Sequence, residues 1–93
     1  MFETKHAQDR SQQRCIPPLI KEWLIEYGTR TRGPHKAIVC HFDRTSRRRL
    51  SASVGKEVVK RLGGMLDTYL VLSNDEQTLI TAGHRSKRIR RLD

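Results

Sequence analysis

One apolar stripe constrains the fold of this chain more than any other feature of its sequence. The side chains that form it recur at steps of three and four residues: Ile16, Leu19, Ile20, Trp23, Leu24 and Tyr27. This spacing places them on one face of an α-helix. A proline at 17 or 18 suits the first helical turn, and Gly28 suits a left-handed stop after the last turn. The stripe predicts a helix from about Pro17 to Tyr27, with both aromatic residues in the core.

Two further helices are expected around it. Residues 5–14 are almost wholly polar and predict a surface helix. A second apolar stripe predicts a long helix over residues 46–66, with Thr45 or Ser46 as its N-terminal cap. Gly55 weakens the middle of that helix, so two shorter helices meeting near residues 53–55 are the alternative. The Gly33-Pro34 pair makes residues 29–36 a basic surface loop.

Three runs of apolar and β-branched residues predict strands, at 37–42, 68–73 and 77–82. The last two are separated by the short polar segment 74–76, which is typical of a hairpin. The expected fold is therefore α+β, with two N-terminal helices and one longer helix packed on a small, mainly antiparallel three-stranded sheet. We expect residues 1–93 to form a single domain, with mobile ends at 1–4 and 88–93.

The charge of the chain indicates a polyanionic partner. Nineteen Lys and Arg against ten Asp and Glu give a formal charge of +9, which favours nucleic acid or an acidic protein. Two clusters are dense enough to span several phosphates: Arg47, Arg48 and Arg49, and Lys87, Arg88, Arg90 and Arg91. No apolar run approaches the roughly 20 residues of a membrane span, and the first residues lack a secretion signal. We therefore expect a cytoplasmic protein with no membrane partner.

The two cysteines indicate no metal centre and no disulfide framework. Cys15 and Cys40 stand in no zinc-ligand spacing and are expected to be reduced and mostly buried. A metal site built from both cysteines, His41 and another histidine is the alternative. Phosphate-binding loops, H-E-x-x-H and the nucleophile elbow are absent from the sequence. We expect no metal and no cofactor.

Three local strings resemble those of small bacterial proteins of unknown function related to the RelE/ParE toxin superfamily. They are His6-Ala7-x-x-Arg10-x-x-Gln13-Arg14 before the apolar helix, the closing hairpin over residues 69–81, and His84-Arg85 after it. Barnase-like and colicin-like members of that superfamily are metal-independent ribonucleases. The resemblance implies a phosphate-binding face between the first helix and the last strands, RNA rather than DNA as the substrate, and an acidic partner such as an antitoxin. The predicted 46–66 helix departs from the smallest toxins.

The resemblance also implies roles for individual residues. His6, His84 and Arg85 are the predicted catalytic residues, because RNA cleavage without metal needs a base, an acid and a cation near the phosphate. For nucleic-acid binding the resemblance implies Arg10 and Thr81. Tyr69 is predicted to stack on a base, and the charge clusters add Arg47, Arg48, Arg49, Lys87, Arg88, Arg90 and Arg91. Three alternatives stay open: a DNA- or RNA-binding protein without catalysis, a protein-interaction module for an acidic partner, and a His84 that is merely solvated. His41 is interpreted as a hydrogen-bonded strand histidine.

Overall fold

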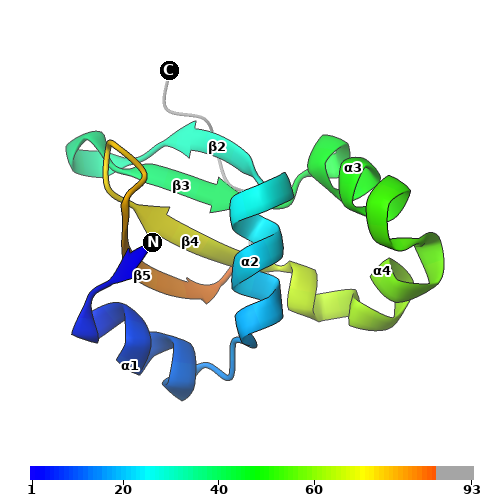
Figure 1. Cartoon of the computed structure of the whole chain (residues 1–93), viewed down its shortest axis with the longest axis horizontal. Coiled ribbons are helices and arrows are strands. Elements are labelled where there is room, and N and C mark those ends of the chain that lie inside the picture. The colour runs from blue at the N-terminus through cyan, green and yellow to red at the C-terminus, as the bar shows by residue number, and fades with distance from the viewer. Residues whose placement is uncertain (86–93) are drawn as a thin grey trace.

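The computed structural model describes residues 1–85 and shows an α+β fold built on one mixed sheet of five strands (Figure 1). The strands are β1 (Phe2–Glu3), β2 (Thr29–Arg32), β3 (Ile38–His41), β4 (Thr68–Leu72) and β5 (Thr78–His84). Their order across the sheet is β1-β5-β4-β3-β2. Only β1 and β5 run parallel; the other neighbours are antiparallel. The predicted three-stranded sheet with three helices is therefore wrong, although the hairpin of the last two strands is confirmed.

The additional strands are both edge strands, and neither has a strong sequence signal. The predicted basic loop at residues 29–36 is instead β2, which pairs with β3, followed by the short helical turn η1 (Pro34–Lys36). The Thr-Arg alternation of β2 buries Thr31 but has no apolar run, and charged side chains are typical of strand edges. β1 has only two residues, which pair with Thr78 and Leu79. Sequence periodicity cannot detect so short a strand.

Four α-helices accompany the sheet: α1 (Lys5–Gln13), α2 (Pro18–Tyr27), α3 (Arg44–Val54) and α4 (Lys56–Leu62). The first two confirm the predicted helices. The single long helix over 46–66 is wrong and its alternative is confirmed, because Gly55 adopts φ +98 and separates α3 from α4, which the turn η2 (Gly63–Leu66) follows. Asp43, rather than Thr45 or Ser46, caps α3. Its carboxylate accepts from the Ser46 backbone N–H at 2.9 Å, and the Ser46 hydroxyl accepts from the Asp43 N–H at 2.8 Å.

Helix α2 ends differently from the prediction. Gly28 has φ −63 and is not left-handed. Glycine is needed there because a Cβ would lie 2.4 Å from the Leu24 oxygen and 2.7 Å from the Cys40 sulfur. The last carbonyls of α2 are instead capped by Arg30, whose guanidinium donates to the Gly28 and Ile25 oxygens at 2.7 and 2.5 Å.

The main core lies between α2 and the sheet. Ile20 and Leu24 of α2 are fully buried against Leu70 and Leu72 of β4, and Leu50 extends this core into α3. Trp23 and Tyr27 are partly buried and pack on its border. Figure 1 shows α2 crossing the near face of the sheet, α1 below β5, and α3 and α4 to one side. No helix within residues 1–85 has both the length and the apolar character that a bilayer span requires.

Candidate functional site

The candidate site lies on the face of the sheet that is turned away from α2, which we call the rear face. The Cys40 thiol donates to the Leu24 carbonyl of α2 at 2.7 Å, so Cys40 and its cross-strand partner Leu70 face that helix. Side chains alternate along a strand, and His41 and Tyr69, also cross-strand partners, therefore point to the rear face. Tyr69 is only partly buried there. At this end the rear face thus presents His41 and Tyr69, and Val39 and Val71 lie further along it, whereas Cys40, Leu70 and Leu72 face α2.

Arg14 and Tyr69 converge above Gly83 on this face. The Arg14 guanidinium reaches β5 from the end of α1 and donates to the Ala82 carbonyl at 3.0 Å. A Cβ at Gly83 would lie 2.3 Å from Arg14 Nη1 and 2.7 Å from Tyr69 Oη. The guanidinium and the phenol hydroxyl are thus close neighbours, and only glycine leaves room for both. A glycine inside a strand often marks such a close approach, which is the sequence signal that could have found this position.

Arg85 brings a second guanidinium to the same end of the sheet. Its backbone N–H donates to the Asp67 carbonyl at 2.7 Å, and Nη2 donates to the Phe42 carbonyl at 2.5 Å. Phe42 directly follows β3, so the side chain extends from the end of β5 to the end of β3. The Nε atom is buried and has no hydrogen-bond partner within residues 1–85. We call Arg14, His41, Tyr69, Gly83 and Arg85 the Tyr69 site.

Asp43 lies beside this site, close to its member His41. His41 is 4% exposed and lies between Thr29 and Tyr69 in the strand register. Burial opposes ionisation of Asp43, but hydrogen bonds from the Ser46 backbone and from the Thr29 and Ser46 hydroxyls, together with nearby His41, lower the pKa of its carboxyl to about 2. The end of β3 therefore carries a carboxylate at neutral pH, directly after Phe42, whose carbonyl accepts from Arg85.

His84 lies at the same end of the sheet but on its other side. In the strand register it pairs with Thr68, whose side chain shares the α2 side with Leu70. Nε2 lies 2.7 Å from the Arg14 carbonyl, and Nδ1 lies 3.4 Å from the Thr68 hydroxyl. A carbonyl oxygen only accepts, so Nε2 is the donor. The ring therefore fastens the end of α1 to the end of β5 and fixes the backbone of Arg14.

The other predicted residues of α1 and β5 are His6, Arg10 and Thr81. His6 is exposed on the first turn of α1, and Arg10 is half-buried one turn further on. Steps of four residues place both on the side of the helix that leads to Arg14. Thr81 is half-buried on the rear face, opposite Val71.

The predicted arginine cluster of α3 is divided. Arg47 forms an ion pair with Asp67 at 2.8 Å, and the Asp67 carbonyl holds Arg85, so Arg47 borders the Tyr69 site. Arg48 is exposed, and Arg49 donates to the Tyr27 carbonyl at the end of α2. The predicted residues Lys87, Arg88, Arg90 and Arg91, and the predicted mobile end at 88–93, lie outside the described residues.

No family model, curated protein or solved structure matches this chain. The relation to RelE/ParE proteins therefore stays a prediction.

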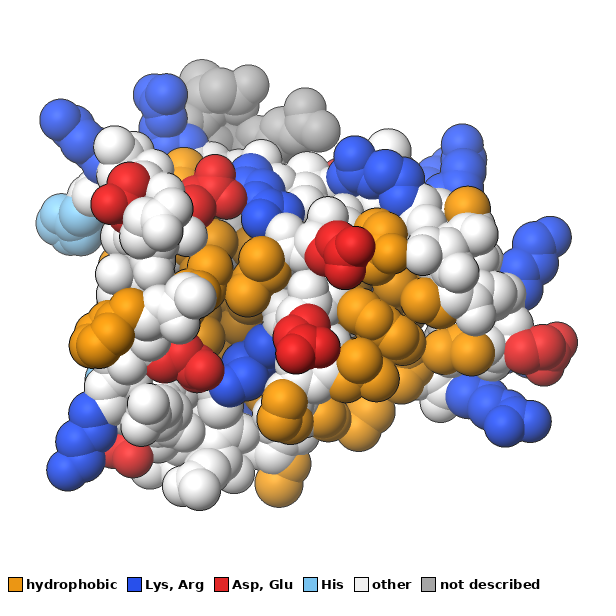
Figure 2. Space-filling view, viewed as in Figure 1, with side chains coloured by type: hydrophobic (Ala, Val, Ile, Leu, Met, Phe, Trp, Pro, Cys, Tyr) orange, Lys and Arg blue, Asp and Glu red, His pale blue; other side chains and the backbone are white. Residues whose placement is uncertain are grey.

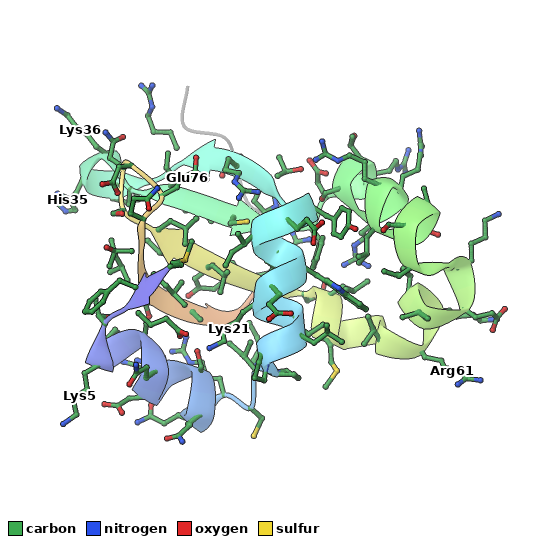
Figure 3. The ribbon with its side chains drawn as sticks, in the orientation of Figure 1. Lys5, Lys21, His35, Lys36, Arg61 and Glu76 are labelled. Carbon is green, nitrogen blue, oxygen red and sulfur yellow. The ribbon has the colours of Figure 1, made fainter. Side chains whose placement is uncertain are left out.

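Other candidate sites have fewer side chains that are suited to binding a ligand. A hollow of about 370 Å³ lies between α1 and α2, where Lys21 points inward (Figure 3). Its amine already pairs with Glu3 at 2.9 Å. Cys15 is exposed, contrary to the prediction, while Cys40 is buried as predicted. Within residues 1–85 no three or more His, Cys, Asp or Glu side chains cluster as metal ligands would.

Proposed function

We propose that the protein binds RNA through the Tyr69 site, with Arg14 and Arg85 holding phosphate oxygens. The observation that carries this proposal is the convergence of Arg14 Nη1 and Tyr69 Oη above Gly83. Guanidinium groups match phosphate in both charge and geometry. The formal charge of +9 adds long-range attraction for a polyanion.

Single-stranded RNA fits this site better than duplex DNA. Reading the major groove of DNA requires a protruding helix or ribbon, whereas Tyr69 lies on the face of a sheet. Unpaired bases are commonly bound by stacking on an aromatic ring of this kind. The resemblance of the α1 and β5 strings to RelE/ParE proteins supports the same substrate and a cytoplasmic setting.

RNA cleavage without metal is the second candidate function. It is favoured by the resemblance to RelE/ParE proteins of the α1 and β5 strings, which contain His6 and His84. In this reaction a base removes the proton of the 2′-hydroxyl, whose oxygen attacks the adjacent phosphorus, and an acid protonates the departing 5′-oxygen. The products are a 2′,3′-cyclic phosphate and a 5′-hydroxyl. We propose His6 and His84 as base and acid, with the arginines stabilising the charge on the phosphorane. To act in this way the His84 ring must release the Arg14 carbonyl and also turn from the α2 side of the sheet towards the arginines.

Binding is tested by fluorescence anisotropy with a labelled single-stranded RNA of about ten nucleotides, titrated at several salt concentrations. Arg14→Ala and Arg85→Ala are each expected to weaken binding and to reduce the salt slope by about one. Lys36→Ala is the matched control, because Lys36 is exposed and lies at the opposite end of the sheet (Figure 3). Equal losses in all three variants would show that binding is diffuse and does not use this site.

Cleavage is tested on the same RNA in EDTA, with the product ends identified by mass spectrometry. A 2′,3′-cyclic phosphate that disappears in His6→Ala and His84→Ala supports the ribonuclease. Intact RNA, or cleavage unchanged in both variants, removes this candidate and leaves the binding proposal in place.

A further inference from the structure

A second surface with the features of an interface lies between α2 and α4. Figure 2 shows hydrophobic side chains gathered into one patch beside α2 and over the α4 region. Its most exposed members are Leu19 of α2 at 46%, Met65 of η2 at 43% and Val58 of α4 at 38%. Trp23 of α2 and Leu62 of α4 are partly buried against the core. We call these five residues the α2–α4 patch. Contiguous apolar surface of this kind usually marks an interaction site.

The two borders of the patch carry opposite charges. Glu22 and Glu26 are both exposed and stand four residues apart on the outer side of α2. Lys60 and Arg61 are exposed in the last turn of α4. Figure 2 shows acidic side chains over α2 and cations beyond α4, and Figure 3 shows Arg61 pointing away from the body there. Exposed Glu57 lies on the α4 side as well, but the cations outnumber it.

We infer that the α2–α4 patch is the interface of a symmetric dimer of this chain. A two-fold axis through the patch exchanges its borders, so that Glu22 and Glu26 of one copy face Lys60 and Arg61 of the other. Each such contact occurs twice, and the apolar centre of both copies leaves water. A uniformly acidic partner would match the α4 border but would be repelled by the α2 border. The surface is therefore complementary to itself.

The sparse packing of α4 supports the same inference. None of its seven residues is fully buried, although helices this short are unstable without tertiary packing. It is flanked by Gly55 and Gly63, both with positive φ, and a Cβ at either glycine would touch nothing within 4 Å. A second copy packed on α4 supplies the contacts that the single chain does not. The Tyr69 site lies on the rear face, and the dimer inference does not depend on its function.

The test is sedimentation velocity on the full chain over a concentration series. We expect the native protein to reach twice its mass of 10.8 kDa. Glu26→Lys and Arg61→Glu are each expected to weaken this dimer about tenfold, because like charges then meet at both contacts. An equimolar mixture of the two variants should dimerise as well as the native protein, since both contacts again join opposite charges. Lys5→Glu is the control, because it makes the same change of charge as Arg61→Glu but on α1, and it should not affect the dimer (Figure 3).

Three results would overturn the inference. One is a native protein that stays monomeric up to about 1 mM, where even weak specific association is visible. Another is a dimer that is indifferent to both charge reversals. The third is a mixture of the two variants that dimerises no better than either variant alone, which would place the reversed residues outside the contact.

Discussion

The imidazole of His84 donates to the backbone carbonyl of Arg14 at 2.7 Å, although 70 residues separate them in the sequence. That carbonyl is at the C-terminal end of α1, where a helix leaves oxygens without partners of its own. The bond therefore completes α1 and at the same time fixes the residue whose guanidinium meets Tyr69.

His84→Ala is expected to lower the free energy of unfolding by about 1 kcal/mol, the usual net contribution of one hydrogen bond. It should also weaken RNA binding, because the end of α1 is released. Urea unfolding measures the first effect and anisotropy the second. His6→Ala, which changes an exposed residue of the same helix, should stay within about 0.5 kcal/mol of the native protein. Equal stabilities of the two variants would contradict the proposed role of His84.

Gly83→Ala should disturb the site directly. The new methyl group would overlap Arg14 Nη1 and the Tyr69 ring, and such overpacking typically costs about 1–3 kcal/mol. RNA affinity should fall with it. Gly64→Ala makes the same chemical change where nothing lies within 4 Å, and should be neutral or slightly stabilising. Thermal unfolding and anisotropy of both variants check this; an unaltered affinity in Gly83→Ala would count against the Tyr69 site.

The Asp43 cap predicts a loss of stability in acid. Since the pKa of this carboxyl is lowered from 3.8 to about 2, its contribution is complete above about pH 4 and disappears as the pH falls towards 2. Asp43 is half-buried and solvent screens its charge in part, so we expect only about 1 kcal/mol. Asp43→Asn keeps a capping oxygen but does not titrate. Its unfolding free energy should therefore fall less than that of the native protein between pH 4 and pH 2, and parallel curves would exclude this role.

The two thiols should react at very different rates. Cys15 is exposed, whereas Cys40 is buried and donates to the Leu24 carbonyl. Burial raises the pKa of Cys40 to about 11, despite nearby Arg30, and the thiolate is the reactive form. With Ellman's reagent at pH 8 we expect one thiol to react at once and the second only in denaturant. Cys15→Ser should abolish the fast phase, and a fast phase that remains would mean that Cys40 is accessible.

The elements that could be predicted from sequence are those whose own residues carry the pattern. The α2 stripe and the apolar runs of β3, β4 and β5 reflect burial, which is periodic along the chain. β1 and β2 form because neighbouring strands offer them unpaired backbone groups. The residues of Phe2–Glu3 and Thr29–Arg32 themselves carry little pattern that would predict a strand. The left-handed conformation predicted for Gly28, at the end of α2, is wrong for a similar reason. Glycine is required there by the Leu24 carbonyl oxygen and also by the sulfur of Cys40, which lies twelve residues later on another element.

The residues of the candidate site were likewise predictable only in part from sequence. Thr81 and Arg85 were chosen from the resemblance and Tyr69 as a ring that could stack on a base, and the structure places Tyr69 and Arg85 at one end of the sheet. The participation of Arg14 depends on the packing of α1 against β5, which no local pattern encodes. His84 and Arg85 are adjacent in sequence, yet strand alternation sends the His84 ring to the α2 side, away from Tyr69 on the rear face.

The pairing of Phe2–Glu3 with Thr78 and Leu79 has a consequence for how the protein matures. Residues 2–3 can pair with their partner strand only after residues 78–79 have left the ribosome. Arg14 likewise cannot contact Ala82 and Gly83 before that segment has been synthesised. The Tyr69 site therefore cannot assemble until the segment that contains Ala82 and Gly83 has left the ribosome.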